Sequence, residues 1–188
     1  MGQRVIRIQQ ILLILSFCPP TAYCLPPTML PIVEQIALKI VARLETITIA
    51  GGYHQTVAGV VRPTRLGGFS PEHHLIVVEQ ADPERPPAPE TEGNVLLKEW
   101  LQPWWIKLFV RPSDTDLTPV DAWVNIFLAD CIKALTAPAS WHTWDGLAIN
   151  SYYRDPVGFV TEKGDHEGAM LPLYVHYRHP EDDPFAVG

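Results

Sequence analysis

The chain has 188 residues, of which 47% are hydrophobic and 19% charged, and its formal net charge is −7. These values are typical of one globular domain that is large enough to bury a core without disulfides or structural metal. The acidic balance argues against a protein that binds nucleic acid through a broad basic surface.

The first 28 residues differ from the rest of the chain. Two arginines precede the apolar run 8–17 and two proline pairs follow it, which is the outline of a signal peptide and is too short for a transmembrane helix. The competing interpretation is a spurious upstream extension, with the functional chain starting at Met29. The segment contains no acidic residue, which favours this second interpretation. The predicted division is an N-terminal extension 1–28, an α+β domain 29–180 and an acidic tail 181–188.

A helix and two strands are predicted first. Residues 30–46 repeat isoleucine, valine and leucine at three- and four-residue steps, which is typical of an amphipathic helix. Residues 53–61 alternate enough to be a strand. Residues 74–80 contain four successive apolar side chains, which indicates a buried strand.

The loop 81–93 is polar and rich in proline, and it precedes the central part of the chain. Such a composition does not pack, and a loop of this length usually moves or meets a partner. Residues 96–100 lead into a strand over 104–111, and Pro103 between them is expected to mark a bulge or a bend. The aromatic and branched side chains of 104–111 suit a strand that is covered on both faces, or nearly so.

A second helix is predicted over 118–137, because a threonine that can cap it and a proline suited to the first helical position stand at its start. Strands over 147–153 and 170–177 follow, joined by 158–168 as an antiparallel hairpin with a long tip. The elements together predict an α+β domain. We expect a mostly antiparallel or mixed sheet of about five strands with two helices packed on one face.

No catalytic, cofactor-binding or metal-binding motif is found, so we expect neither an enzyme nor a cofactor. The GxSxG, HExxH, P-loop and GxGxxG patterns are absent. The three cysteines form no CxxC pair, and Cys131 is predicted to be a small buried hydrophobe. Among the seven histidines, the neighbours His73 and His74 would point to opposite sides of a strand, so they could not share one ion there.

Surface features suited to binding other proteins remain. Trp141 and Trp144 lie in one loop, where the alternatives are an interface, the end of the core or a platform for a ligand. The candidate protein-contact residues are Arg62, Arg65, Glu84, Arg85, Trp141, Trp144, Glu162, Lys163, Asp182 and Asp183.

Several segments together carry a family resemblance, although none of them is catalytic and each alone is weak. They are IVEQIA at 32–37, GYHQTV at 52–57 leading to Arg62-Pro63, FVRPSD at 109–114, the helix from Thr118-Pro119 on, and HYR at 176–178 before EDDP at 181–184. Through them the chain from about Met29 to Gly188 resembles the tail-terminator or tail-completion proteins (minor tail proteins) of long-tailed phages and prophages.

The resemblance implies a structural α/β subunit that assembles as a ring, often a hexamer, at the head-proximal end of the tail. Its partners would be itself, the tail-tube protein and the head-completion or connector protein, with loop 81–93, the tip 158–168 and the acidic tail as contact elements. It implies no membrane and no sequence-specific nucleic acid, although DNA would pass through the ring. The protein would be assembled in the host cytoplasm into the virion. The alternative, which takes the N-terminal segment at face value, is a secreted or periplasmic protein-binding domain.

Overall fold

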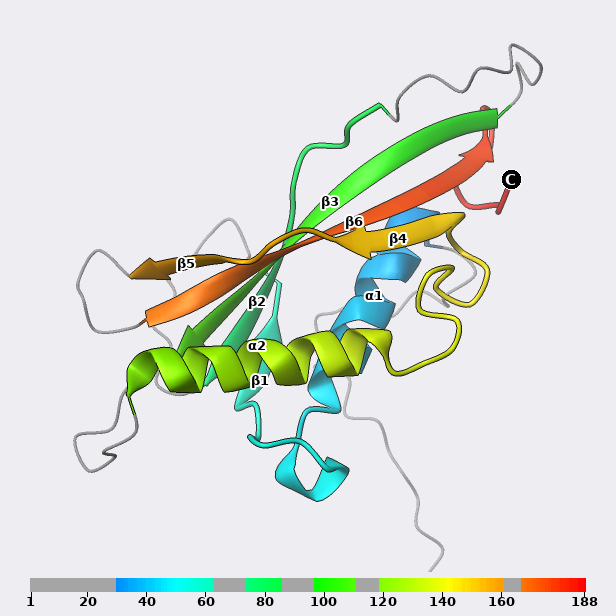
Figure 1. Cartoon of the computed structure of the whole chain (residues 1–188). Coiled ribbons are helices and arrows are strands. Elements are labelled where there is room, and N and C mark those ends of the chain that lie inside the picture. The colour runs from blue at the N-terminus through cyan, green and yellow to red at the C-terminus, as the bar shows by residue number, and fades with distance from the viewer. Residues whose placement is uncertain (1–29, 63–73, 86–96, 111–118, 161–166) are drawn as a thin grey trace, which may run out of the picture.

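The computed structural model describes residues 30–62, 74–85, 97–110, 119–160 and 167–188. These residues form an α+β domain with two α-helices and a mixed, largely antiparallel sheet of six strands, as predicted (Figure 1). The elements in chain order are α1 Ile32–Glu45, the 3-10 helix η2 Ile49–Gly51, β1 Gly59–Val61, β2 Leu75–Gln80, β3 Leu97–Val110, α2 Val120–Thr136, β4 Asn150–Tyr153, β5 Val157–Val160 and β6 Glu167–Pro180.

The sheet is organised around a long central pair, β3 and β6. These two antiparallel strands have 14 residues each and pair along their whole length. The strand order is β1-β2-β3-β6-β4, with β5 on the same side of β6 as β4, and only the β1–β2 pair is parallel among the described strands. Because β2 pairs with β3 only over Trp104–Phe109, the β3 residues 97–103 and their β6 partners project beyond it as an arm (Figure 1).

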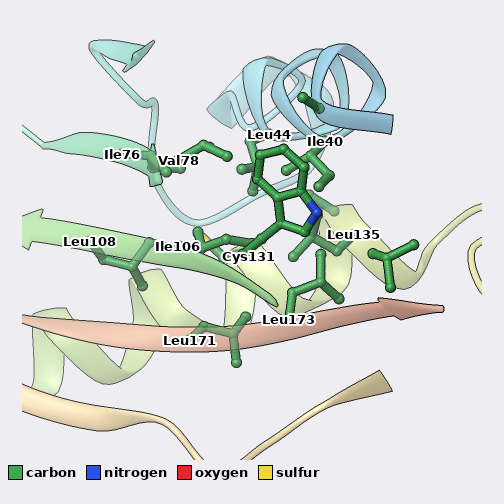
Figure 2. Packing of buried hydrophobic residues seen from close by; sticks show 14 of the residues in the cluster. Ile40, Leu44, Ile76, Val78, Ile106, Leu108, Cys131, Leu135, Leu171 and Leu173 are labelled. Carbon is green, nitrogen blue, oxygen red and sulfur yellow. The ribbon is translucent and has the colours of Figure 1, made fainter. Parts of the chain in front are cut away.

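Both helices lie on one face of the sheet, where they also contact each other (Figure 1). Each helix turns one apolar stripe toward the strands, and alternate strand residues point back at it. Figure 2 shows this core from close by. Its members include Ile40 and Leu44 of α1, Cys131 and Leu135 of α2, Ile76 and Val78 of β2, Ile106 and Leu108 of β3, and Leu171 and Leu173 of β6.

The predicted strand over 53–61 is shorter in the structure, where only β1 is a strand. The reason lies in α2, whose Asp130 is 1% exposed. Its carboxylate accepts the backbone N–H groups of His54 at 2.9 Å and Gln55 at 3.2 Å. These two N–H groups are therefore bound to a helix side chain and are not free to pair with a strand. This part of the chain forms η2 and a loop that is fastened to α2.

The β3–β6 register runs without interruption from Leu97↔Pro180 to Val110↔Glu167, so the bulge, one of the two alternatives expected at Pro103, is absent. The carbonyl oxygen of Pro103 accepts the N–H of Ala81 at 3.1 Å, and Ala81 lies just past the end of β2. In an antiparallel strand the nitrogen and the oxygen of one residue point to the same side. The missing N–H of Pro103 therefore faces the end of β2 and leaves its pairing with β6 intact.

The C-terminal hairpin is present and gains a sixth strand, since β4 and β5 both pair antiparallel with β6. The acidic tail after β6 folds back onto the domain. The carbonyl oxygen of Pro184 accepts the N–H of Ile32 at the start of α1, at 3.1 Å. Glu181 pairs with Lys98 at 2.9 Å on the arm.

Candidate protein-contact surface

One face of the sheet has no described helix over it. Residues next to the core-facing ones point away from α1 and α2, because side chains alternate along a strand. Apolar side chains from four neighbouring strands occupy this second face, which we call the open face. Its members are Leu75 and Val77 of β2, Leu101, Trp105 and Phe109 of β3, Met170 and Tyr174 of β6, and Tyr152 of β4.

The open face is unusually apolar for a sheet surface that lacks a helix. An antiparallel sheet with one face in water normally alternates apolar and polar residues. Here Trp105 and Tyr152 each leave 37% of their surface exposed, and Val157 of β5 on the same side is also exposed. The other members Leu75, Val77, Leu101 and Tyr174 are buried, with 8–9% of their surface exposed. Patches of this kind mark surfaces that meet another protein or a ligand.

Two tyrosines give the open face a fixed aromatic centre. The rings of Tyr152 and Tyr174 are directly opposite each other on β4 and β6, with centroids 5.2 Å apart and planes within 3° of parallel. The guanidinium carbon of Arg154 lies 4.3 Å from the centroid of the Tyr174 ring. Stacking and cation–π contact both hold these side chains in one arrangement, so little conformational entropy is left to lose on binding.

The open face carries an ion pair beside Trp105 and a histidine–carboxylate contact toward the arm. The ammonium group of Lys107 pairs with the carboxylate of Glu79 and lies 5.6 Å from the centroid of the Trp105 ring. Toward the arm, His176 Nε2 lies 3.2 Å from Glu99 Oε2. The Lys107–Glu79 pair therefore adds no net charge to this part of the open face.

The outer strands at the two ends of the strand order, β1 and β4 with β5, are poorly suited to accepting a strand from another chain. At one edge β1 has three residues. At the other edge, Tyr153 and Val157 are four residues apart, whereas their partners on β6, Leu173 and Met170, are three apart. The extra residue forms a β-bulge that includes Pro156 and separates β4 from β5. His142 Nδ1 lies 3.0 Å from the carbonyl oxygen of Ser151 at this edge. Short strands, bulges and prolines all discourage edge pairing, so contact through the face is favoured.

The structure separates the two tryptophans of the loop before β4. Trp144 is fully buried and donates its indole N–H to Ser151 Oγ at 2.7 Å. The guanidinium of Arg43 lies 4.0 Å from its ring centroid, and burial lowers the pKa of this arginine, with the Asp145 carboxylate acting in the opposite direction. Trp144 therefore belongs to the core and is not available as a surface contact.

Trp141 remains at the surface beside β4. Its ring centroid lies 3.7 Å from that of His142 and 6.4 Å from that of Tyr153. Ile149 is exposed where the same loop enters β4. We call these four side chains the β4 patch: Trp141, His142, Ile149 and Tyr153.

The other predicted contact residues are dispersed. Arg62 pairs with Glu34 and joins the end of β1 to α1. Glu84 bridges β3 beside the arm, with its N–H 2.8 Å from the Leu101 carbonyl oxygen, and Arg85 next to it is exposed. Asp182 and Asp183 are exposed in the folded-back tail. Arg65, Glu162 and Lys163 lie outside the described residues.

The open-face residues were not among the predicted contact residues. The signal that could have found them was present in β3, where Trp105 and Phe109 stand among core residues that the alternation assigns to the other face. A strand with apolar side chains on both faces has to be covered on both faces, and the two predicted helices cover only one of them.

Asp130 and Cys131 of α2 contribute to the fold. His54 Nδ1 lies 2.9 Å from Asp130 Oδ1, but this carboxylate is already occupied by two backbone N–H groups and fastens a loop. Burial, reinforced by the Asp130 charge, raises the pKa of the Cys131 thiol well above its ordinary value of 9.0, so Cys131 stays neutral. Within the described part of the chain, no three His, Cys, Asp or Glu side chains are grouped as around a metal ion.

None of the described helices has the length and apolar character needed to cross a bilayer. No protein-family model matches this sequence, and no curated protein matches it either.

Proposed function

We propose that this chain is a structural subunit of a phage tail or neck. Copies of it would form a ring that ends the tail tube and provides the surface on which the head joins. The observation that carries the proposal is the group of exposed apolar side chains on the open face, Trp105, Tyr152 and Val157, because such side chains are suited to contact with another subunit.

The chain's charge fits the same function. A ring at the end of a tail tube has to let DNA pass without retaining it, and a net charge of −7 repels the phosphate backbone. The resemblance of residues 29–188 to tail-terminator proteins makes the ring the specific form of assembly that we propose. Such a protein acts through the geometry of its contacts. Identical contacts between subunits close the ring, and the loops reach the tube and the head.

A tube-capping assay tests the proposal. Tail-tube protein of the phage or prophage that encodes this chain is polymerised with and without the full chain, and tube lengths are measured by electron microscopy. We expect shorter tubes that carry a ring at one end. Tubes of unchanged length, with no added density at either end, would contradict the proposal.

A further inference from the structure

The acidic tail, residues 181–188, lies beside the end of the arm (Figure 1). Its last residue, Gly188, is close against the arm, since a Cβ added there would lie 2.7 Å from Leu97 Cδ2. In the middle of the tail, the carbonyl oxygen of Pro184 accepts the N–H of Ile32, the first residue of α1, at 3.1 Å. The acidic tail therefore connects the arm to the start of α1.

One histidine links the arm to the acidic tail. Trp100 of β3 donates its indole N–H to His179 Nε2 at 3.2 Å. On the other side of the same ring, His179 Nδ1 lies 2.6 Å from the carbonyl oxygen of Pro180. That oxygen also accepts the N–H of Asp183, at 3.2 Å, which closes the turn between β6 and the tail. A continuous row of hydrogen bonds therefore runs from the arm through the His179 ring into the acidic tail.

The two partners of His179 fix its protonation state. An indole N–H can only donate, so Nε2 is the ring nitrogen without a hydrogen. A carbonyl oxygen can only accept, so Nδ1 is the nitrogen that carries the hydrogen. Only the neutral imidazole meets both conditions, because the protonated ring has a hydrogen on each nitrogen. Protonation would point the new Nε2 hydrogen at the indole hydrogen of Trp100, and the hydrogen bond between them would be lost.

The charges around His179 offer no ion pair in place of this hydrogen bond. The titratable and charged groups on the elements around the ring are Lys98 of β3, Tyr177 and Arg178 of β6, Glu34 of α1, and Glu181, Asp182 and Asp183 of the acidic tail. Lys98 stands opposite His179 in the register and pairs with Glu181 at 2.9 Å. Glu34 pairs with Arg62, and the two aspartates are exposed to water. In the described part of the chain, no carboxylate is paired with the His179 ring.

We propose that the acidic tail is a strap that neutral His179 holds closed and that protonation of His179 releases. Histidines in open chains take up a proton near about pH 6.5. The open state of the tail can bind this proton, whereas the closed state excludes it, so a lower pH favours the open state. Opening would expose Leu97 of the arm and leave the N–H of Ile32 to water. The switch works within one chain, with or without a ring.

Hydrogen exchange of the full chain, measured by mass spectrometry at about pH 7.5 and about pH 5.5, tests the switch. The readout is the protection of the backbone N–H groups that are bonded in the closed state, corrected for the intrinsic exchange rate at each pH. They are those of Ile32, Asp183, Phe185 and Ala186. We expect their protection to fall about tenfold at the lower pH, where about ten imidazoles of the open state are protonated for each neutral one. The N–H groups of β2 should stay equally protected.

Two substitutions test the role of the histidine. Glutamine is neutral at both pH values and its oxygen can accept the Trp100 N–H, so His179→Gln should keep the tail equally protected at both. His176→Gln is the matched control, because this second histidine of the arm contacts Glu99 and should leave the fall as large as in the wild type. Trp100→Phe removes the indole hydrogen that opposes protonation and should also abolish the fall. This variant replaces His179→Gln if glutamine leaves the tail open at both pH values.

Three results would overturn the switch. The first is a wild-type tail whose protection is equal or greater at the lower pH. The second is a fall in protection that His179→Gln, or Trp100→Phe in its place, retains in full. The third is a fall that His176→Gln abolishes, which would assign the pH dependence to the contact between His176 and Glu99.

Discussion

The rings of Tyr152 and Tyr174 lie stacked on the open face, with centroids 5.2 Å apart. The two residues face each other across the β4–β6 pair, so this contact fixes the aromatic centre of a surface that no described helix covers.

Removing one ring from this stack should weaken self-association more than it weakens the fold. Tyr152 is partly exposed, and tyrosines near the centre of an interface commonly contribute about 1.4 kcal/mol or more, roughly a tenfold change in affinity. We expect Tyr152→Ala to raise the dissociation constant of the assembly at least about tenfold. Sedimentation over a concentration series measures it, with Ile49→Ala as the control that should behave like the wild type. Equal dissociation constants for the two variants would exclude Tyr152 from the contact.

Asp130 should be required for stability even though it lies among core residues. Its Oδ2 accepts the N–H groups of both His54 and Gln55, and the uncharged amide oxygen of an asparagine would accept these two hydrogen bonds more weakly than the carboxylate does. We expect Asp130→Asn to lower the free energy of unfolding by about 1–3 kcal/mol. Urea unfolding measures this change. Asp82→Asn, at an exposed position, is the matched control and should leave stability within about 0.5 kcal/mol.

Trp144 should behave as a core residue and Trp141 as a surface residue. Trp144→Phe removes the hydrogen bond to Ser151 and part of the buried ring, so we expect a loss of about 1–3 kcal/mol in the free energy of unfolding. Trp141→Phe should cost much less stability and should weaken assembly instead. Thermal unfolding and native mass spectrometry of both variants check this. Equal loss of stability in the two variants would contradict the assignment.

The fold should become less stable at alkaline pH. Burial and the Asp130 charge raise the pKa of Cys131 well above its ordinary value of 9.0, and burial raises the pKa of Tyr177 above 10.0. The unfolded chain therefore releases these protons at a lower pH than the folded chain. The stabilisation is complete below about pH 9, and the free energy of unfolding should fall as the pH rises further.

Urea unfolding between about pH 8 and pH 10.5 measures this decline. Cys131→Ala removes the thiol, so the decline in this variant should be smaller than in the wild type. The comparison uses the slope with pH, since the variant also loses stability at every pH. An identical slope in both proteins would mean that the thiol titrates normally in the folded state.

Much of the fold could be predicted because it depends on local patterns. The helical repeats of α1 and α2 and the alternation in β6 assigned the core-facing residues, and the two helices lie on one face of the sheet as expected. The short β1 could not be predicted. Its neighbours His54 and Gln55 are bound by Asp130, and a contact between residues 76 positions apart leaves no local signal.

The contact surface was harder to predict for a related reason. Apolar residues on both faces of β3 suggested two covers, but sequence does not show which strands lie beside it or where the helices end up. Trp141 and Trp144 were inseparable in sequence, since both are tryptophans in one loop. The left-handed turn at Trp144 and Asp145 decides which ring enters the core. Glycine is the residue that usually indicates such a turn in a sequence, and neither of these two positions is a glycine.

Assembly through the open face is tested most directly by the mass of the full chain in solution, measured by light scattering across a concentration series beside Trp105→Arg and Ile49→Arg. We predict a discrete ring-sized species for the wild type and for Ile49→Arg, and a monomer for Trp105→Arg with an unchanged circular dichroism spectrum. A wild-type chain that stays monomeric throughout, or a Trp105→Arg variant that assembles as well as Ile49→Arg, would contradict assembly through the open face.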